Sequence, residues 1–440
     1  MKKKISVFWF RRDLRLEDNA GLFHSLKEGN EVLPVFIFDK NILDRLDQKQ
    51  DRRVDFIYQA ILKLQGKLLL HGSSLTVLYD TPINAFKQIT EKFEVKSVFT
   101  NRDYEPSALE RDTKIENYLK AKDIVFNTFK DQVIFEKHEV LKSNSEPYTV
   151  FTPYSKIWKG KLDETYLATF SSEKLLDRFL KTPPISIPSL EKMGFEKTDL
   201  KFKPPKIDLE IIKNYDSTRN IPSVNGTTKL SVHLRFGTVS VRQLAKIGLK
   251  LNEQWLNELI WREFFMSILF HFPKVTIQSF KKKYDMIKWR NNENEFEKWC
   301  KGQTGYPIVD AGMRELNKTG FMHNRVRMIV ASFLTKHLLI DWRWGEAYFA
   351  EKLLDYELSS NNGNWQWAAG CGCDAAPYFR IFNPAEQTKR FDPEHKYIKK
   401  WVKELTSPGY PAPIVEHRFA RERALKVYKE GVQQIGSNDF

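Results

Sequence analysis

The sequence lacks any long apolar run, and it has little cysteine. No stretch reaches the roughly 18 uninterrupted apolar residues of a membrane-spanning helix. The amino-terminal run "ISVFWF" is too short for a signal peptide and is closed by arginines, so it predicts a first strand instead. Three cysteines in 440 residues indicate a reducing compartment, and the cytoplasm is the expected location. The pair Cys371 and Cys373 has no second ligand pair, so we expect no metal site.

Internal repeats and low-complexity tails are also missing, but positive charge is abundant. The formal net charge is +15 and the isoelectric point is about 9.4. A polyanion is one partner that such a charge favours, and a basic enzyme with solvated lysines is the other interpretation. Tryptophan and phenylalanine, with 11 and 32 residues, serve either for stacking on flat rings or as ordinary core.

Residues 1–130 predict a doubly wound, Rossmann-like domain with a parallel sheet. Short apolar runs at 5–10, 32–38, 74–79 and 95–101 alternate with helical stretches such as 54–69 and 108–121. No GxGxxG follows the first run, so the dinucleotide fingerprint is absent. Residues 131–205, rich in proline and charge, predict a long ordered connector. Helical spacing from 206 to 440, clearest at 255–270 and 325–354, predicts an all-α domain.

The segment "NGTTKLSVHLRFG" (225–237) has the composition of a phosphate-binding loop. Thr227, Thr228, Lys229 and Ser231 offer hydroxyls, backbone N–H groups and a cation before a predicted helix. A helix cap without any ligand has the same appearance, so both interpretations stay open.

The segment "NELIWREF" places Glu258, Trp261 and Arg262 on one face of a helix, since they are three and four residues apart. A carboxylate beside an indole and a guanidinium suits a planar, hydrogen-bonding ligand. The alternative is a core tryptophan flanked by a surface ion pair.

The segment "MHNRVRMIVASF" places Asn324, Arg327 and Met328 on one helical face. Asp355 follows later in the chain and is the expected partner of Arg327, because a buried arginine needs a counter-charge. On a helix, His323 would point about 100° away from Asn324.

These segments together resemble the photolyase/cryptochrome family, and within it the class I-type cyclobutane pyrimidine dimer photolyases. The resemblance includes "VFWFRRDLRLEDNAGL", "NELIWREF", "TGYPIVDAGMREL", "MHNRVRMIVASFLTKHLLIDWRWGE" and "NNGNWQWAAGCGCDAAPYFRIFNP", and it covers essentially the whole chain. It implies a carboxy-terminal helical domain that binds FAD and damaged DNA, with the amino-terminal domain as the antenna domain.

The resemblance assigns residues to the cofactor and to electron transfer. Asn361 would face the flavin N5 atom, and Arg327 would pair with Asp355 beside the ring. The FAD-binding residues that it implies are Tyr215, Thr227, Thr228, Lys229, Leu230, Ser231, Trp255, Glu258, Arg262, Asn324, Arg327, Asp355, Glu357 and Asn361. A tryptophan chain, Trp365, Trp342 and Trp289, would reduce oxidised FAD in light; the alternative is three core tryptophans.

The resemblance also implies the substrate. A cyclobutane pyrimidine dimer, flipped out of UV-damaged DNA, would receive an electron from excited, reduced FAD and split into two pyrimidines. Glu258 would stabilise the radical anion of the dimer. The implied DNA-binding residues are Glu258, Trp261, Asn324, Arg325, Met328, Trp367 and Arg380. Asn324 and Met328 stand where enzymes that repair the (6-4) photoproduct have histidines, and an amide at position 361 resembles photolyases rather than sensors.

Two departures from the family pattern are visible. Glu357 stands where the family commonly has the shorter aspartate, so its contact with the flavin ring is open. Ala108 stands near the position of a folate-binding glutamate, so an antenna, if present, is expected to be a deazaflavin or a second flavin.

The alternatives from other classes are a cryptochrome-like blue-light sensor, a (6-4) photolyase, and a flavoprotein that binds nucleic acid without repairing it. Only ten residues follow the family-like "YPAPIVEHRFARERALKVYKE", which leaves little room for a signalling tail. We expect a monomer in the cytoplasm, associated with the nucleoid.

Overall fold

The computed structural model describes residues 2–433, and the chain forms two compact units. The first contains the residues up to Glu139, Gly160–Ile207 and Lys229–Lys250. The second contains Val140–Lys159, Asp208–Thr228 and the residues from Leu251 onward. The sequence predicted three consecutive ranges, 1–130, 131–205 and 206–440. The compact units interleave along the chain: the expected connector divides between them, and Lys229–Lys250 of the expected helical domain belongs to the first unit.

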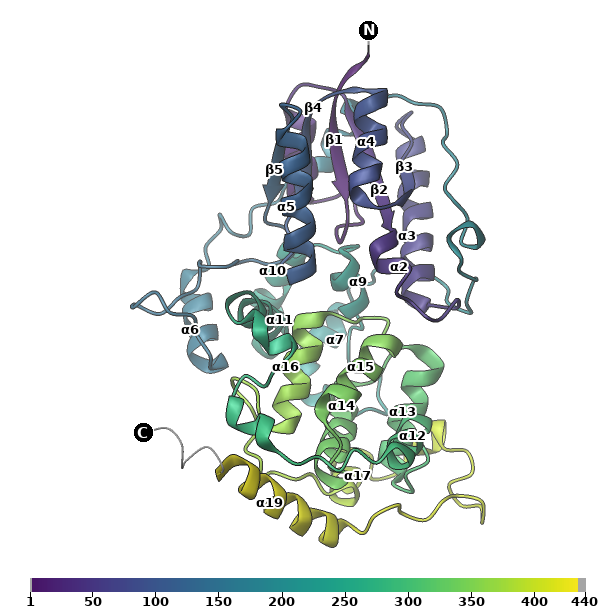
Figure 1. Ribbon diagram of the computed structural model, residues 1–440, viewed down its shortest axis with the longest axis vertical. Helices are drawn as coiled ribbons and strands as arrows, with labels where there is room; N and C mark the ends of the chain where they lie inside the picture. Colours follow the sequence, from purple (N-terminus) through teal and green to yellow (C-terminus); the bar gives the residue numbers. More distant parts are fainter. Residues whose placement is uncertain (1, 434–440) are drawn as a thin grey trace. The chain divides into compact units, whose positions relative to one another are not determined.

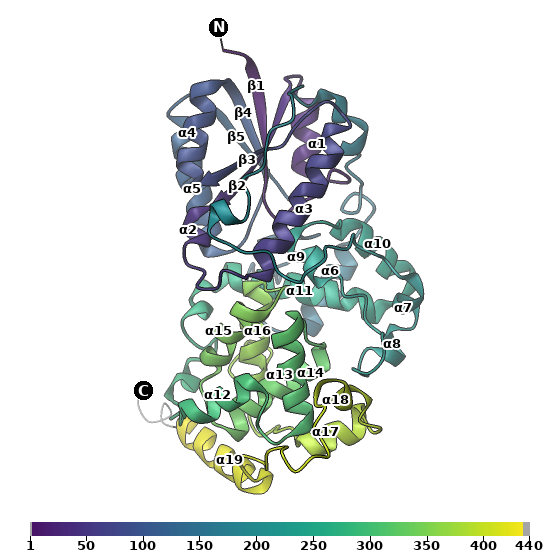
Figure 2. The ribbon, with the colours of Figure 1, turned by 90° about the vertical axis from the view of Figure 1, so that its right-hand side faces the viewer.

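The first unit is built on a five-stranded, all-parallel sheet in the order β3-β2-β1-β4-β5. Figure 2 shows α4 and α5 on one face of this sheet and α1 and α3 on the other. The strands are β1 (Lys4–Phe10), β2 (Val32–Asp39), β3 (Thr76–Asp80), β4 (Glu94–Asn101) and β5 (Val125–Phe129). The helices are α1 (Ala20–Lys27), α2 (Lys40–Leu43), α3 (Arg52–Leu69), α4 (Pro82–Lys92), α5 (Pro106–Lys120), α9 (Ser231–Phe236) and α10 (Val241–Leu251).

The central strands are apolar along their length because helices cover both faces of the sheet. Every residue of β1 after Lys4 is buried, and Phe10 pairs in register with Phe36 of β2. The predicted doubly wound domain is therefore confirmed. The sequence missed the edge strand β5, whose residues are half-buried or exposed and include Asn127 and Thr128.

The predicted connector is ordered but has little regular structure. It contains α6 (Phe151–Lys161) and three short 3-10 turns, η1 (Ser172–Lys174), η2 (Leu176–Arg178) and η3 (Glu191–Met193). Within the first unit, the N–H of Leu180 donates to the carbonyl of Val32 at 2.8 Å. The carboxylate of Asp55 accepts from both the N–H and the hydroxyl of Thr198. Such contacts order the connector, although its sequence has neither helical nor strand periodicity.

The second unit is helical, as predicted (Figure 1). Its longest helix, α11 (Glu253–His271), begins where the side chain of Asn252 accepts from the N–H of Trp255 at 2.9 Å. Besides α6, the other helices are α7 (Leu209–Lys213), α8 (Tyr215–Thr218), α12 (Glu293–Lys301), α13 (Pro307–Thr319), α14 (Asn324–Ser332), α15 (Trp342–Lys352), α16 (Leu358–Ala369), α17 (Pro384–Phe391), α18 (Lys396–Trp401) and α19 (His417–Gln433). Short 3-10 turns η4 (Pro273–Thr276) and η5 (Lys282–Met286) follow α11.

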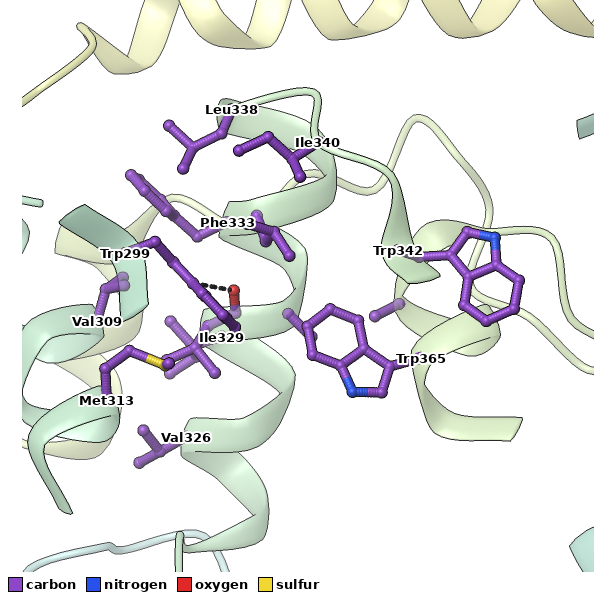
Figure 3. Close-up of a cluster of buried hydrophobic side chains, with 14 of the residues drawn as sticks. Trp299, Val309, Met313, Val326, Ile329, Phe333, Leu338, Ile340, Trp342 and Trp365 are labelled. Atoms are coloured by element: carbon purple, nitrogen blue, oxygen red, sulfur yellow. Dashed lines mark hydrogen bonds between the residues drawn. The ribbon is translucent and has the colours of Figure 1, made fainter. Parts of the chain in front are cut away.

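The stretch 325–354, expected to be helical throughout, is three elements. α14 runs into a π-helix, η6 (Phe333–His337), and α15 begins after a break at 338–341. Leu339 adopts a left-handed conformation with φ of +51°, which a helix does not accommodate. The side chain of Asp341 then accepts from the N–H of Arg343 and begins α15. The apolar spacing continues across the break because both helices face one core, which contains Phe333, Leu338, Trp342 and Trp365 (Figure 3).

Candidate functional site

The second unit contains an open pocket, or cavity, between α14, α15 and α16. These helices lie side by side (Figure 1). The lining residues are Asn324, Arg327, Met328, Ala331, Phe349, Leu353, Asp355, Tyr356, Glu357, Ser360, Asn361, Asn364, Trp365, Trp367 and Ala368. An apolar wall with a few convergent polar groups is typical of cofactor sites.

The face of α14 that the sequence predicted is present in the cavity wall. Asn324, Arg327 and Met328 all line it. The guanidinium Nη2 of Arg327 donates to both carboxylate oxygens of Asp355, at 3.1 and 2.9 Å, and its Nε donates to the carbonyl of Met322 at 2.7 Å. The expected ion pair therefore forms, and it fixes a cation and a carboxylate at the cavity wall.

His323 does not share the cavity face with Asn324 and Met328, but the helical reason expected for this does not apply. This residue is the N-cap of α14 rather than part of the helix, and its Nδ1 accepts from the N–H of Arg325 at 3.2 Å. The ring is buried, with an exposed fraction of 5 %. The helical angle of 100° does not apply to a cap residue, whose backbone is outside the helical region. His323 is not among the cavity-lining residues.

Asn361 on α16 lines the cavity and has a partner that sequence reasoning missed. Its amide Nδ2 donates to the backbone carbonyl and to the Oε1 of Glu346, both at 3.0 Å. Burial raises the pKa of the Glu346 carboxyl, and the hydrogen bond from Asn361 opposes that shift. Glu346 therefore fixes the amide orientation. No local signal identifies it, because it lies 15 residues away on another helix.

Glu357, the departure from the family pattern, is tied to α11. Its Oε1 accepts from Arg262 Nη2 at 2.9 Å, and its Oε2 accepts from the hydroxyl of Ser360 at 3.3 Å. The carboxylate lines the cavity and is buried, with an exposed fraction of 6 %. The longer side chain thus has two partners in the protein, and its contact with a flavin ring stays a prediction.

Glu258, Trp261 and Arg262, which share one face of α11, contact three different partners. Arg262 pairs with Glu357, and Glu258 pairs with Arg219 at 2.8 Å. Burial raises the pKa of Glu258, while the charge of Arg219 lowers it. Trp261 stacks on Phe151, with ring centroids 3.7 Å apart. Glu258 and Trp261 are not among the residues that line the cavity, and Trp255 is buried in the core.

The predicted phosphate segment crosses the boundary between the two units, at Thr228–Lys229. α9 begins at Ser231, as expected, and Lys229 has φ of +53°. Tyr215 begins α8, and burial raises the pKa of its phenol. The role of Thr227, Thr228, Lys229, Leu230 and Ser231 in holding a diphosphate stays a prediction.

The three tryptophans of the predicted electron path differ in burial. Trp365 and Trp342 are each 2 % exposed and belong to one apolar cluster (Figure 3). Trp289 is half-buried and meets Tyr428 edge-on, with centroids 5.7 Å apart. Trp299, which the sequence did not single out, lies 6.1 Å from Trp365, and its Nε1 donates to the carbonyl of Val330 (Figure 3).

Positive charge gathers around Arg325. Burial lowers the pKa of its guanidinium, and the charges of Arg219, Arg390 and Arg380 lower it further. Nη2 of Arg325 donates to Asn220 Oδ1 at 2.7 Å, and Arg380 is exposed. Such a cluster attracts phosphates. The sequence predicted Arg325 and Arg380 but missed Arg219 and Arg390, which lie in other segments.

The cavity residues fit a flavin. A flavin ring edge carries both N–H and C=O groups, and the wall offers carboxylates and amides as acceptors and a guanidinium and amides as donors. Trp365, Phe349 and Leu353 supply apolar surface beside them. Within residues 2–433, no three His, Cys, Asp or Glu side chains come together as ligands for a metal ion, and no helix has the length and apolarity to cross a membrane.

Comparison with known proteins agrees with this geometry. Residues 6–172 match the family model described as DNA photolyase, and residues 255–408 match the FAD binding domain of DNA photolyase. The deoxyribodipyrimidine photo-lyases of Synechococcus sp. and Escherichia coli are each 35 % identical to this chain. Both alignments cover 96 % of this chain, and they cover 96 % and 98 % of those relatives.

Two solved structures have the same fold over nearly their full length. The class III photolyase from Agrobacterium tumefaciens has a TM-score of 0.86 and 31 % identity, with 99 % of each chain covered. The photolyase from Sulfolobus tokodaii, described with two FAD molecules and a novel light-harvesting cofactor, has a TM-score of 0.81 and 34 % identity, covering 97 % of this chain and 99 % of that one. With full-length relatives above 30 % identity, this chain belongs to the photolyase/cryptochrome family.

Proposed function

We propose that this protein is a light-driven DNA repair enzyme, a deoxyribodipyrimidine photo-lyase that splits cyclobutane pyrimidine dimers. The observation that carries the proposal is the cavity, which brings Asn324, Met328, Asn361 and Trp367 together in one wall. The relatives named deoxyribodipyrimidine photo-lyase support the reaction class. FAD, when bound, would supply the absorption of blue or near-UV light and the electron donated to the dimer.

The chain's own residues would bind and orient the two ligands. Arg327 and Asp355, with Asn361, would hold the flavin ring edge. The two fused pyrimidines would lie between Trp261 and Trp367, with Glu258 accepting a hydrogen bond from a pyrimidine edge. Photolyases are known to act on nucleotides that have left the duplex. Arg325 and Arg380 would bind the flanking phosphates.

The choice of lesion rests on the residues of α14. Repair of the (6-4) photoproduct needs a proton donor, and neither Asn324 nor Met328 in the cavity wall is one at neutral pH. Cleavage of a cyclobutane dimer needs an electron more than an acid. The amide of Asn361, held by Glu346, adds no charge beside a reduced flavin, which favours repair over sensing.

The protein is expected to act as a monomer in the cytoplasm, on the chromosome. We also propose that any antenna chromophore is a deazaflavin or a flavin rather than folate. Ala108, near the folate-binding position, is buried with an exposed fraction of 6 % and has no carboxylate to offer. The two FAD molecules of the Sulfolobus tokodaii photolyase support a second flavin.

The experiment uses purified, chemically reduced protein and an oligonucleotide with one thymine dimer, in blue light and in darkness. A (6-4) oligonucleotide runs in parallel, and Trp367→Ala is compared with Lys429→Ala, an exposed site on α19 outside the cavity. We expect light-dependent loss of the dimer alone, strongly reduced in Trp367→Ala. Repair of the (6-4) lesion alone would contradict the interpretation of α14. Repair of neither lesion, with a flavin that still photoreduces, would indicate a sensor.

A further inference from the structure

Trp261 has one of its ring faces stacked on Phe151 within the second unit. The rings of Trp261 and Phe151 are nearly parallel, at 4°, with centroids 3.7 Å apart. Ring pairs that overlap face to face are less favourable than offset or edge-on pairs, because like quadrupoles meet. Surrounding contacts must therefore hold this pair. Phe264 meets Trp261 edge-on at 5.6 Å, and Phe265 lies 5.5 Å away.

Phe151 is itself fixed, because α6 is anchored along α11. Phe151, Tyr154 and Trp158 form one buried face of α6. Nε1 of Trp158 donates to Glu263 Oε1 at 2.5 Å, inside the protein. Tyr154 packs on Phe264 with centroids 5.2 Å apart. The Trp261 indole therefore cannot turn without displacing a buried ring on an anchored helix.

The same end of α6 is tied to the segment that follows Trp367. The N–H of Phe151 donates to Asp374 Oδ2 at 2.9 Å. The N–H groups of Cys371 and Gly372 donate to the carbonyl of Gln366, which holds this segment against the end of α16. A short chain of contacts thus joins Trp367 on α16 to Trp261 on α11, and Phe151 is its link to the indole.

We propose that Phe151 is a positioning residue that holds Trp261 as one fixed wall of the dimer-binding slot, so that the lesion stacks on the indole face opposite Phe151. This inference rests on the proposed function. A wall fixed in advance reduces the ordering cost of binding, so removing the Phe151 ring weakens lesion binding without altering phosphate contacts. The selectivity for damaged over undamaged DNA then depends on a residue that does not itself touch the lesion.

The test is binding in darkness, with full-length protein whose FAD content is measured by absorbance. Fluorescence anisotropy gives the Kd for an oligonucleotide with one thymine dimer and for its undamaged counterpart. In Phe151→Leu we expect the dimer Kd to rise about three- to tenfold, the range of an aromatic pair contact, with the undamaged Kd unchanged. Phe151→Tyr retains the ring and should bind within about twofold of wild type.

Two further variants keep the test decisive if Phe151→Leu folds poorly. Asp374→Ala removes the acceptor for the Phe151 N–H and should give a smaller loss of the same, dimer-selective kind. Tyr154→Leu removes one of the rings that anchor α6, and it should also give a smaller, dimer-selective loss. Lys429→Ala, at an exposed site on α19, is the control and should leave both Kd values unchanged.

Three results would overturn the inference: an unchanged dimer Kd in Phe151→Leu, equal weakening for both oligonucleotides, or a dimer-selective loss in Lys429→Ala as large as that in Phe151→Leu. A wild-type protein without any preference for the dimer would instead overturn the proposed function, and this inference with it.

Discussion

The ion pair between Arg327 and Asp355 should show an unequal response to removal of either partner. Both side chains line the cavity, but their exposed fractions differ: 25 % for Arg327 and 7 % for Asp355. Arg327→Met leaves the more buried carboxylate without its counter-charge. Asp355→Leu leaves a guanidinium that still donates to the carbonyl of Met322 and still reaches water. The arginine substitution should therefore cost more.

The expected magnitudes follow from burial. Stranding a buried charge costs about 3 kcal/mol, so Arg327→Met should lower the free energy of unfolding by about that amount. A partly solvated guanidinium that loses two charged hydrogen bonds costs about 2 kcal/mol. Replacing both partners by apolar side chains leaves no stranded charge, so the double variant should lose less stability than either single variant, and much less than the sum of the single losses.

The assay is urea unfolding followed by tryptophan fluorescence, which reports on the second unit because every tryptophan except Trp9 lies there. All samples contain the same concentration of FAD, since a bound ligand adds to the apparent stability. Equal losses for the two single variants would refute the burial argument. A double variant that loses the full sum would show that the two groups do not interact.

Three other predictions address charge, DNA and electron transfer. Burial raises the pKa of Glu346 above its usual 4.5, so ionisation of this carboxyl opposes folding once the pH exceeds 4.5. Glu346→Gln should therefore raise the urea midpoint at pH 7. The gain should vanish below about pH 4, where the carboxyl is protonated in both the folded and the unfolded state. Arg380→Ala should reduce the slope of log K against log salt for DNA binding by about 0.9, while Lys429→Ala leaves it unchanged. Trp365→Phe should slow the photoreduction of bound, oxidised FAD at least about tenfold, as measured by flavin absorbance under blue light. The Kd for DNA in darkness should not change. An unchanged photoreduction rate would exclude Trp365 from the electron path.

Much of the fold follows from local patterns. β1 and β2 are recognisable because strands covered on both faces are apolar throughout. β5 was missed because an edge strand is half-exposed and carries polar residues. The break at Leu339 was missed for a different reason: helical spacing reports the face that meets the core, and α14 and α15 share one core across the break. The N-cap Asp341 was the available signal.

The site was predictable only in part. Helical spacing shows which residues share a face, and it placed Arg327 beside Asn324 and Met328 correctly. It does not show what a face meets. Glu346 lies 15 residues from Asn361 in the chain, and Phe151 lies 110 residues from Trp261, so no spacing rule connects either pair.

The polar contacts of the cavity wall have a common design that explains how the site tolerates Glu357. A charged or amide group on one helix is held by a group from another element: Arg327 by Asp355, Asn361 by Glu346, and Arg262 by Glu357. The carboxylate that the extra methylene carries at position 357 still has partners: the guanidinium of Arg262 on α11 at 2.9 Å and the hydroxyl of Ser360 at 3.3 Å. Glu357 in place of aspartate therefore leaves no buried charge unpaired. A change of side-chain length at a buried, charged position has to satisfy this condition.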